Sequence, residues 1–220
     1  MFPAPPFLNC FYMFRFLVLC LISLGSSLTM ATETPKYKVM QQDGDFEVRQ
    51  YEPRIVAEVL VEGDMDAATR EGFRKLAGYI FGDNHIKAAQ PVTISAETSS
   101  KIAMTAPVSI EPMEDRKSFA TARTWRVEFT MPNQYNLTTL PRPNNASISI
   151  REIPSRRYAA VRYSGMNTEQ RINEETQRLE DWAHKQGLSI SGMPELARYN
   201  PPWTLPMFRR NEILFPLRQD

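Results

Sequence analysis

Cysteine is almost absent from this chain of 220 residues: Cys10 and Cys20 are the only two, and both lie in the first thirty residues. If this N-terminal segment is cleaved, the remaining chain has no thiol. Such a chain forms no disulfide, has no thiolate to hold zinc and has no cysteine nucleophile. The cysteine content therefore excludes thiol chemistry from the rest of the sequence.

A surplus of charge of either sign is also missing. Lysine and arginine total 26 against 25 aspartate and glutamate residues, so no basic excess favours nucleic acid as a partner. The chain has no GxSxG, no HExxH and no glycine-rich phosphate loop. The sequence thus favours a ligand-binding protein over the enzyme classes that carry these motifs.

The first thirty-one residues resemble an export signal. Arg15 precedes an apolar run at 16–25, and small and polar residues follow it. We expect a signal peptide at 1–31, with Met13 as an alternative start, and hence an exported protein that is periplasmic or secreted. The alternative is an uncleaved membrane anchor, because the apolar stretch at 11–28 is nearly long enough to span a bilayer.

Beyond this segment the chain repeats one pattern of elements. Alternating apolar and polar residues predict strands at 46–51, 54–63, 101–110 and 124–132. A helix is expected at 64–82, with Phe73 on its buried face. The same order returns after about residue 146, and identities at a spacing of 102 residues support an internal duplication. Arg49, Arg54, Ala57, Val59 and Gly63 recur as Arg151, Arg156, Ala159, Val161 and Gly165.

Two such units contribute about eight strands and two helices. Strands joined by short turns pair antiparallel, and curved sheets that close on each other leave few exposed edges. We therefore expect one α+β domain over residues 36–218, with pseudo-repeats at about 36–132 and 146–218. Its strands should form a distorted antiparallel β-barrel flanked by two helices. A groove between the related halves is a natural place for a small apolar ligand.

Three motifs occur in a fixed order: KIAMTAPV at 101–108, FTMPxxY at 129–135 and YNPPWTLPMFRRNEI at 199–213. With them the chain resembles the SOUL haem-binding protein family over about residues 36–218. The resemblance implies duplicated β-α-β-β units in a distorted barrel related to the gyrase-inhibitor-like domains. It also implies non-covalent binding of haem or another tetrapyrrole in an apolar cleft, in transport, storage or buffering.

Candidate residues for each part of a haem site can be named. A haem needs an apolar slot, cations for its two propionates and, in some proteins, an axial donor. The cationic candidates lie on the first helix: Arg70, Arg74 and Lys75. The apolar and aromatic candidates lie in the three motifs: Met104, Met131, Tyr199, Trp203 and Phe208. His85, in the loop after the helix, is the candidate axial ligand, although a solvated surface histidine is the plainer interpretation.

Two other functions stay open at this point. A hydrolase or isomerase could use Glu128 or Glu212, which occupy equivalent positions in the two repeats. Structural ion pairs with Arg126 and Arg210 explain these carboxylates more simply. A protein-interaction module is the other alternative, in which the proline-rich stretch at 200–206 is exposed to a partner. A membrane is expected as a partner only if the N-terminal segment is retained.

Overall fold

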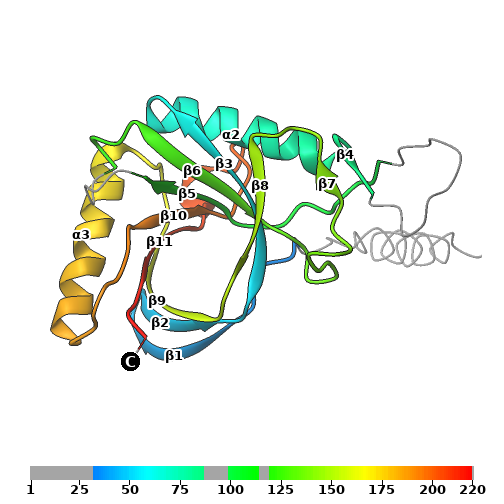
Figure 1. The fold of residues 1–220 in the computed structure, drawn as a ribbon. Coiled ribbons are helices and arrows are strands. Elements are labelled where there is room, and N and C mark those ends of the chain that lie inside the picture. Colours follow the sequence, from blue (N-terminus) through cyan, green and yellow to red (C-terminus); the bar gives the residue numbers. More distant parts are fainter. Residues whose placement is uncertain (1–31, 87–98, 114–118, 220) are drawn as a thin grey trace, which may run out of the picture. The chain divides into compact units, whose positions relative to one another are not determined.

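The computed structural model of this protein describes residues 32–86, 99–113 and 119–219 (Figure 1). The predictions of a signal peptide, of export and of an alternative start concern residues outside these ranges. No helix within the described ranges combines the length and the apolar character that crossing a membrane requires.

The described residues form a strongly curled sheet of nine antiparallel strands with two α-helices packed against it (Figure 1). The order of strands across the sheet is β1-β2-β9-β11-β10-β5-β6-β3-β8, and β4 and β7 form a separate pair. In chain order the elements are β1 (Tyr37–Asp43), β2 (Phe46–Tyr51), β3 (Arg54–Glu62), α2 (Met65–Ile80), β4 (Asn84–His85), β5 (Val108–Pro112), β6 (Thr124–Thr130), β7 (Arg142–Pro143), β8 (Ile148–Ile153), β9 (Arg156–Tyr163), α3 (Glu169–Lys185), β10 (Glu195–Arg198), a 3-10 turn η1 (Pro206–Phe208) and β11 (Asn211–Pro216). The expected α+β class and barrel-like sheet are confirmed.

Two corners curl the sheet into a half-barrel. The chain passes from β2 to β3 through Glu52 and Pro53, and from β8 to β9 through Pro154 and Ser155. Across these corners β2 pairs with β9 while β3 pairs with β8. Proline suits such corners because it cannot donate a ladder hydrogen bond. Strands that lie near opposite ends of the sheet order, β2 with β3 and β9 with β8, are thereby joined by two residues of chain.

The helices begin and end where their capping residues require. The Asp64 carboxylate accepts a hydrogen bond from the Ala67 N–H at 2.8 Å and starts α2. Gly82, with φ +125°, follows its last turn in a conformation that other residues rarely adopt. The Thr168 hydroxyl caps α3 in the same way as Asp64 caps α2. The prediction that the first helix occupies 64–82 is therefore accurate to within a residue or two at each end.

The two faces of the sheet differ in chemistry. On β6, Trp125, Val127 and Phe129 point toward α2 and belong to the main hydrophobic core. The alternate residues Arg126 and Glu128 point to the concave face. Because side chains on a strand alternate, the apolar set fills the space under the helices and the charged set lines the inside of the half-barrel.

Three expectations from the sequence need correction. The strand expected at 101–110 begins only at Val108, because Pro107 just before it has no N–H for a ladder. Strand β1 was not expected, since its side chains are mostly exposed and show no apolar alternation. Phe73, expected in the core, is 42% exposed, although its ring contacts that of Phe129 at a centroid distance of 5.4 Å.

Gly72 allows α2 to lie close to β6. A Cβ at this position would stand 2.5 Å from Val127 Cγ2 and 2.7 Å from Val127 Cβ. We expect Gly72→Ala to destabilise the protein by ~1–3 kcal/mol through overpacking, although alanine favours the helix by ~1 kcal/mol. Urea unfolding measures this change.

Gly78 supplies the matched control, because a Cβ there would meet nothing within 4 Å. Gly78→Ala should be neutral or stabilising by up to ~1 kcal/mol. In the Gly72→Ala background, Val127→Ala should cost less than it does alone. Additive losses in this double-mutant cycle would contradict the packing account.

Candidate functional site

A buried ion pair on the concave face joins the two repeats. Arg49 of β2 donates to Glu212 of β11 through two nitrogens, at 2.6 and 3.0 Å. The side chain of Arg49 is 2% exposed and that of Glu212 is fully buried. Arg210 and the Tyr199 hydroxyl also donate to Glu212, each at 2.8 Å. Tyr199, a candidate for the haem site, is thereby tied to this interior cluster.

A second cluster stands at the repeat-related positions. Arg151 of β8 donates to Glu128 of β6 and to Glu58 of β3, both at 2.8 Å. Arg126 lies 2.6 Å from Glu111 and 3.4 Å from Glu58. This cluster is more open than the first, because Arg151 is 42% exposed. In both clusters an arginine of one repeat bonds to the glutamate of the other.

The two repeat-related glutamates differ in acidity. Burial raises the pKa of Glu128 to about 8, with further increases from the charge of Glu195 and from its contact with Glu58. Burial would also raise the pKa of Glu212, but the hydrogen bond and charge of Arg49, with the charge of Arg210, lower it below its usual range. Each carboxyl is bonded to an arginine, which weighs against their joint use as acid and base. The raised pKa of Glu128 is the one feature that the enzyme hypothesis expected.

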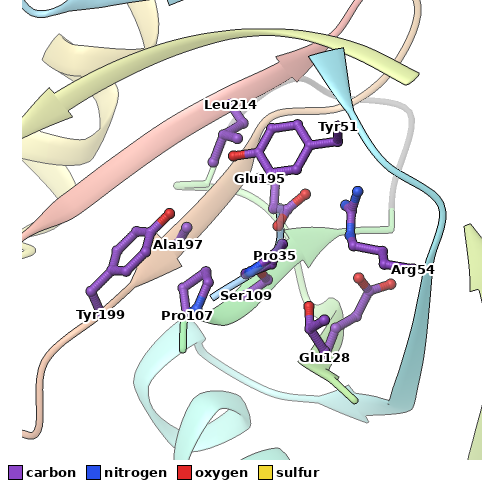
Figure 2. Close-up of a pocket in the computed structure, with 11 residues that line it drawn as sticks. Pro35, Tyr51, Arg54, Pro107, Ser109, Glu128, Glu195, Ala197, Tyr199 and Leu214 are labelled. Atoms are coloured by element: carbon purple, nitrogen blue, oxygen red, sulfur yellow. The ribbon is translucent and has the colours of Figure 1, made fainter. Parts of the chain in front are cut away.

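A pocket opens on the concave face beside the second cluster (Figure 2). Arg54 of β3 and Glu195 of β10 face each other across it, and Glu128 lies next to them. The pocket has a volume of about 10 Å³, close to the room that one water molecule needs. A second space of about 100 Å³ shares Glu128 and Glu195 with it. Both are small, and neither offers the flat apolar slot that haem requires.

Apolar side chains gather on the outside of the molecule, in the loop between β10 and β11. Trp203 is 82% exposed and Phe208 is 70% exposed, which is unusual for aromatic residues of a folded domain. We call the following five exposed residues the loop surface: Trp203, Leu205, Met207 and Phe208 of this loop, and Met166 of the segment between β9 and α3. Trp203 and Phe208 therefore lie outside the core.

Hydrogen bonds to the carbonyl groups of its backbone hold the loop in shape. Arg209 donates to the carbonyl oxygens of Thr204 and Pro202, at 2.8 and 2.5 Å. The N–H of Gly165 donates to the carbonyl oxygen of Pro206 at 2.9 Å, which joins the loop to the segment between β9 and α3. Arg209 also reaches the sulfur of Met166 at 3.6 Å. The apolar side chains are therefore presented by an ordered loop.

The first turns of α2 lie near the start of this loop. Arg198, the last residue of β10, stands 3.8 Å from Asp66 of α2. Arg70 and Phe73 follow Asp66 at helical spacing and share its side of the helix. Arg70 and Arg74 are exposed, with no ion pair in the described part of the chain, whereas Lys75 is bonded to Glu71 at 2.9 Å. Two of the three predicted cations are therefore free to meet an anionic group.

The structure does not bring the other candidates together with the loop surface. Met131 is buried in the main core and Met104 packs against that core, so both fill space under the helices. His85 lies in β4, after the last turn of α2, and its Nδ1 is 2.7 Å from Asn144 Oδ1. The helix has 16 residues and is about 24 Å long, so His85 and the Asp66–Arg198 contact lie at opposite ends of it. His184 is exposed on α3.

Several residues of both sites were not singled out as site residues from the sequence. Met166 and Leu205 carried no signal beyond being apolar, and Arg198 carried none at all. Glu195 likewise had no signal. Arg54 was visible as a position that recurs in the repeat. Its recurrence in the second repeat indicated a structural role for Arg54. Only the fold shows that Arg54 lines a pocket.

Comparison with solved structures supports the fold. The C-terminal domain of EcmrR has a TM-score of 0.56 at 15% identity, covering 84% of this chain and 99% of that domain. A protein from Listeria innocua described as a hydrolase has a TM-score of 0.53 at 10% identity, covering 81% of this chain and 94% of the other. At these identities the likeness concerns architecture alone.

Comparison with sequences supports the family. Heme-binding protein 2 of Homo sapiens is 28% identical over 191 residues, which is 83% of this chain and 85% of the human protein. Heme-binding protein 2 of Mus musculus is 27% identical with the same coverage. The family model described as SOUL heme-binding protein matches residues 32–216, which include the whole described sheet and both helices. The chain belongs to the SOUL haem-binding family.

Proposed function

We propose that this protein binds haem or a related tetrapyrrole non-covalently on the loop surface, as an exchangeable carrier or buffer. The observation that carries the proposal is the exposure of Trp203, Leu205, Met207 and Phe208 on one ordered loop. Large apolar side chains that are exposed together on one loop of a folded domain often mark an interaction site. Membership of a haem-binding family and the names of the human and mouse relatives favour a tetrapyrrole as its occupant.

The surroundings of the loop fit the chemistry of that ligand. The macrocycle is flat and apolar, and aromatic and methionine side chains adapt to such a surface. Its propionates need cations, and Arg70 lies on the side of α2 that faces Arg198, where the loop begins. Arginine suits carboxylates because its planar fork can donate two hydrogen bonds. When bound, haem would supply the iron chemistry, while these residues bind and orient it.

An open surface favours reversible binding. The chain has no CxxCH motif for covalent attachment. No histidine lies in the loop surface, and His85 is placed beyond the far end of α2. Binding that rests mainly on apolar contact and on propionate pairing releases its ligand more readily than iron coordination does. This is the property expected of a carrier or buffer.

Titration with haemin tests the proposal, and alanine variants report the place of binding. Haemin at micromolar concentration should shift the Soret band with saturation. Trp203→Ala with Phe208→Ala should weaken binding about tenfold or more, from the loss of two apolar contacts, and leave the melting temperature unchanged.

Phe81→Ala is the matched control, because Phe81 is also an exposed aromatic residue but lies at the His85 end of α2. It should leave haemin affinity unchanged. A loss of affinity in Phe81→Ala or His85→Ala, with none in the Trp203 and Phe208 variant, would move the site to that end. The absence of any saturable change would overturn haem binding altogether.

A further inference from the structure

We propose that Met166 and Met207 are sites of oxidative modification, and that their conversion to methionine sulfoxide by a peroxide switches off binding at the loop surface. The inference rests on the proposed function in that the ligand released is a tetrapyrrole. The change of the surface from apolar to polar does not depend on which apolar ligand binds there.

Methionine carries the sulfur that an oxidant can reach in this protein. Both cysteines lie in the first thirty residues, so methionine is the only sulfur-containing residue in the rest of the chain. Four methionines are exposed among the described residues: Met40, Met113, Met166 and Met207. Met207 is 67% exposed and Met166 is 55% exposed, so a small peroxide has access to both thioethers. Half of the exposed methionines in the described ranges therefore belong to the loop surface.

The fold brings these two methionines to one small area. The N–H of Gly165 donates to the carbonyl oxygen of Pro206 at 2.9 Å, and each methionine is the next residue after one partner of this bond. Arg209, two residues after Met207, reaches the sulfur of Met166 with its Nη1 at 3.6 Å. The two thioethers come from segments far apart in the chain, yet they lie beside the same loop.

The reaction adds one oxygen atom to each thioether. A lone pair of the sulfur attacks one oxygen of the peroxide, the O–O bond breaks, and the sulfur becomes a sulfoxide. With hydrogen peroxide, the other oxygen leaves as hydroxide and becomes water when it takes the proton of the transferred oxygen. The sulfur is oxidised and the peroxide is reduced. The product is a polar side chain in place of an apolar one.

Arg209 is placed to hold the oxidised form of Met166. Its Nε and Nη2 donate to the carbonyl oxygens of Thr204 and Pro202, which directs Nη1 at the Met166 sulfur. A thioether is a weak acceptor, whereas a sulfoxide oxygen accepts strongly from a cationic donor. At Met207, which is more exposed, solvent hydrates the sulfoxide. Both products put polar groups where a flat apolar ligand makes its contact, and these groups lose hydration when the ligand covers them.

Oxidation of the full chain before titration tests the switch. The protein is treated with hydrogen peroxide, the peroxide is removed, and haemin is added. Oxidation should weaken haemin binding about tenfold or more, because two apolar contacts become polar. Trypsin places Met166 in the peptide 163–171 and Met207 in the peptide 199–209, so mass spectrometry shows which sulfur gained oxygen. Methionine sulfoxide reductases, one for each sulfoxide epimer, should restore the affinity.

Met166→Leu combined with Met207→Leu is the decisive variant, because leucine is apolar, similar in volume and without sulfur. Its haemin affinity before treatment is its own reference, and peroxide should leave that affinity unchanged. Met40→Leu is the matched control, since Met40 is also 55% exposed but lies on β1. Met40→Leu should lose affinity on oxidation as the unaltered protein does. A loss of affinity in the oxidised double leucine variant would place the effect at other residues and overturn the proposal.

A readout without haem separates this proposal from the proposed function. Anilinonaphthalene sulfonate, a dye that reports exposed apolar surface, should give less fluorescence with the oxidised protein than with the reduced one. The double leucine variant should show no such fall. If haemin does not bind before oxidation, the proposed function is overturned, and the dye still decides the switch. If haemin binds, and complete oxidation of both methionines changes neither its affinity nor the dye fluorescence, the switch is overturned and the proposed function stands.

Discussion

Replacing Glu212 with glutamine is expected to lower the free energy of unfolding by about 3–5 kcal/mol, because it leaves the charge of Arg49 buried without its main counter-ion. Arg49 is 2% exposed and Glu212 is fully buried. The amide can still accept hydrogen bonds, but it cannot neutralise Arg49 or Arg210. Glu47, at 2.6 Å from Arg49 Nε, remains as a partial counter-ion and keeps the loss from being larger.

Thermal unfolding measures this effect, with a fall in the melting temperature of about 6–20 °C for a domain of this size. The repeat-related pair provides the comparison: Arg151→Met should cost no more than ~1–2 kcal/mol, since Arg151 is 42% exposed and solvent screens it. Equal losses at Arg49→Met and Arg151→Met would show that burial does not set the strength of these pairs. Replacing both Arg49 and Glu212 with apolar residues should recover part of the loss.

Glu128 should make the protein less stable as the pH rises from about 5 to 9. Its pKa is about 8 in the folded chain, against an ordinary value of 4.5, so the folded state holds a proton that the unfolded state has lost. Between these two values the folded state binds more protons, and stability therefore falls as pH rises. Since each pKa unit corresponds to about 1.4 kcal/mol, we expect a loss of at least ~2 kcal/mol by pH 9.

Glu128→Gln tests this directly, because glutamine resembles the protonated side chain. The variant should match the unaltered protein near pH 5 and should melt about 4–8 °C higher than it at pH 9. Glu152→Gln, at an exposed position of β8, is the matched control and should not change the profile. Parallel melting curves for Glu128→Gln and the unaltered protein at all pH values would contradict the prediction.

Other carboxyl groups determine how the stability of the protein changes at acidic pH. The pKa of Glu212 lies below its usual range, as does that of Glu58, where hydrogen bonds and charges from Arg151 outweigh burial. The stability that these two contribute is present above pH 4.5 and is lost as the pH falls through their folded pKa values. Burial raises the pKa of Glu111, which acts in the same direction as Glu128. The most stable pH should therefore lie between about 5 and 6.

The sequence alone determined the class of the fold. Residues that alternate along a strand, helix caps such as Asp64 and identities 102 residues apart are local features, and each can be read without knowing which strands are neighbours. Local features also predicted the α+β architecture, the distorted barrel-like sheet and the family. They failed at β1, where pairing with β2 holds an exposed strand that has little apolar pattern.

Only the tertiary structure decided which residues share a site. Glu128 and Glu212 occupy equivalent positions in the two repeats. Each carboxylate nevertheless accepts hydrogen bonds from an arginine of the other repeat. The reason is that strands of different repeats are neighbours in the sheet, β2 with β9 and β3 with β8. Met131 and Trp203 both belong to family motifs, yet one is in the core and the other is in solvent. Burial and charge pairing depend on contacts between residues that are far apart in the chain, so no local pattern could specify the exposed loop surface.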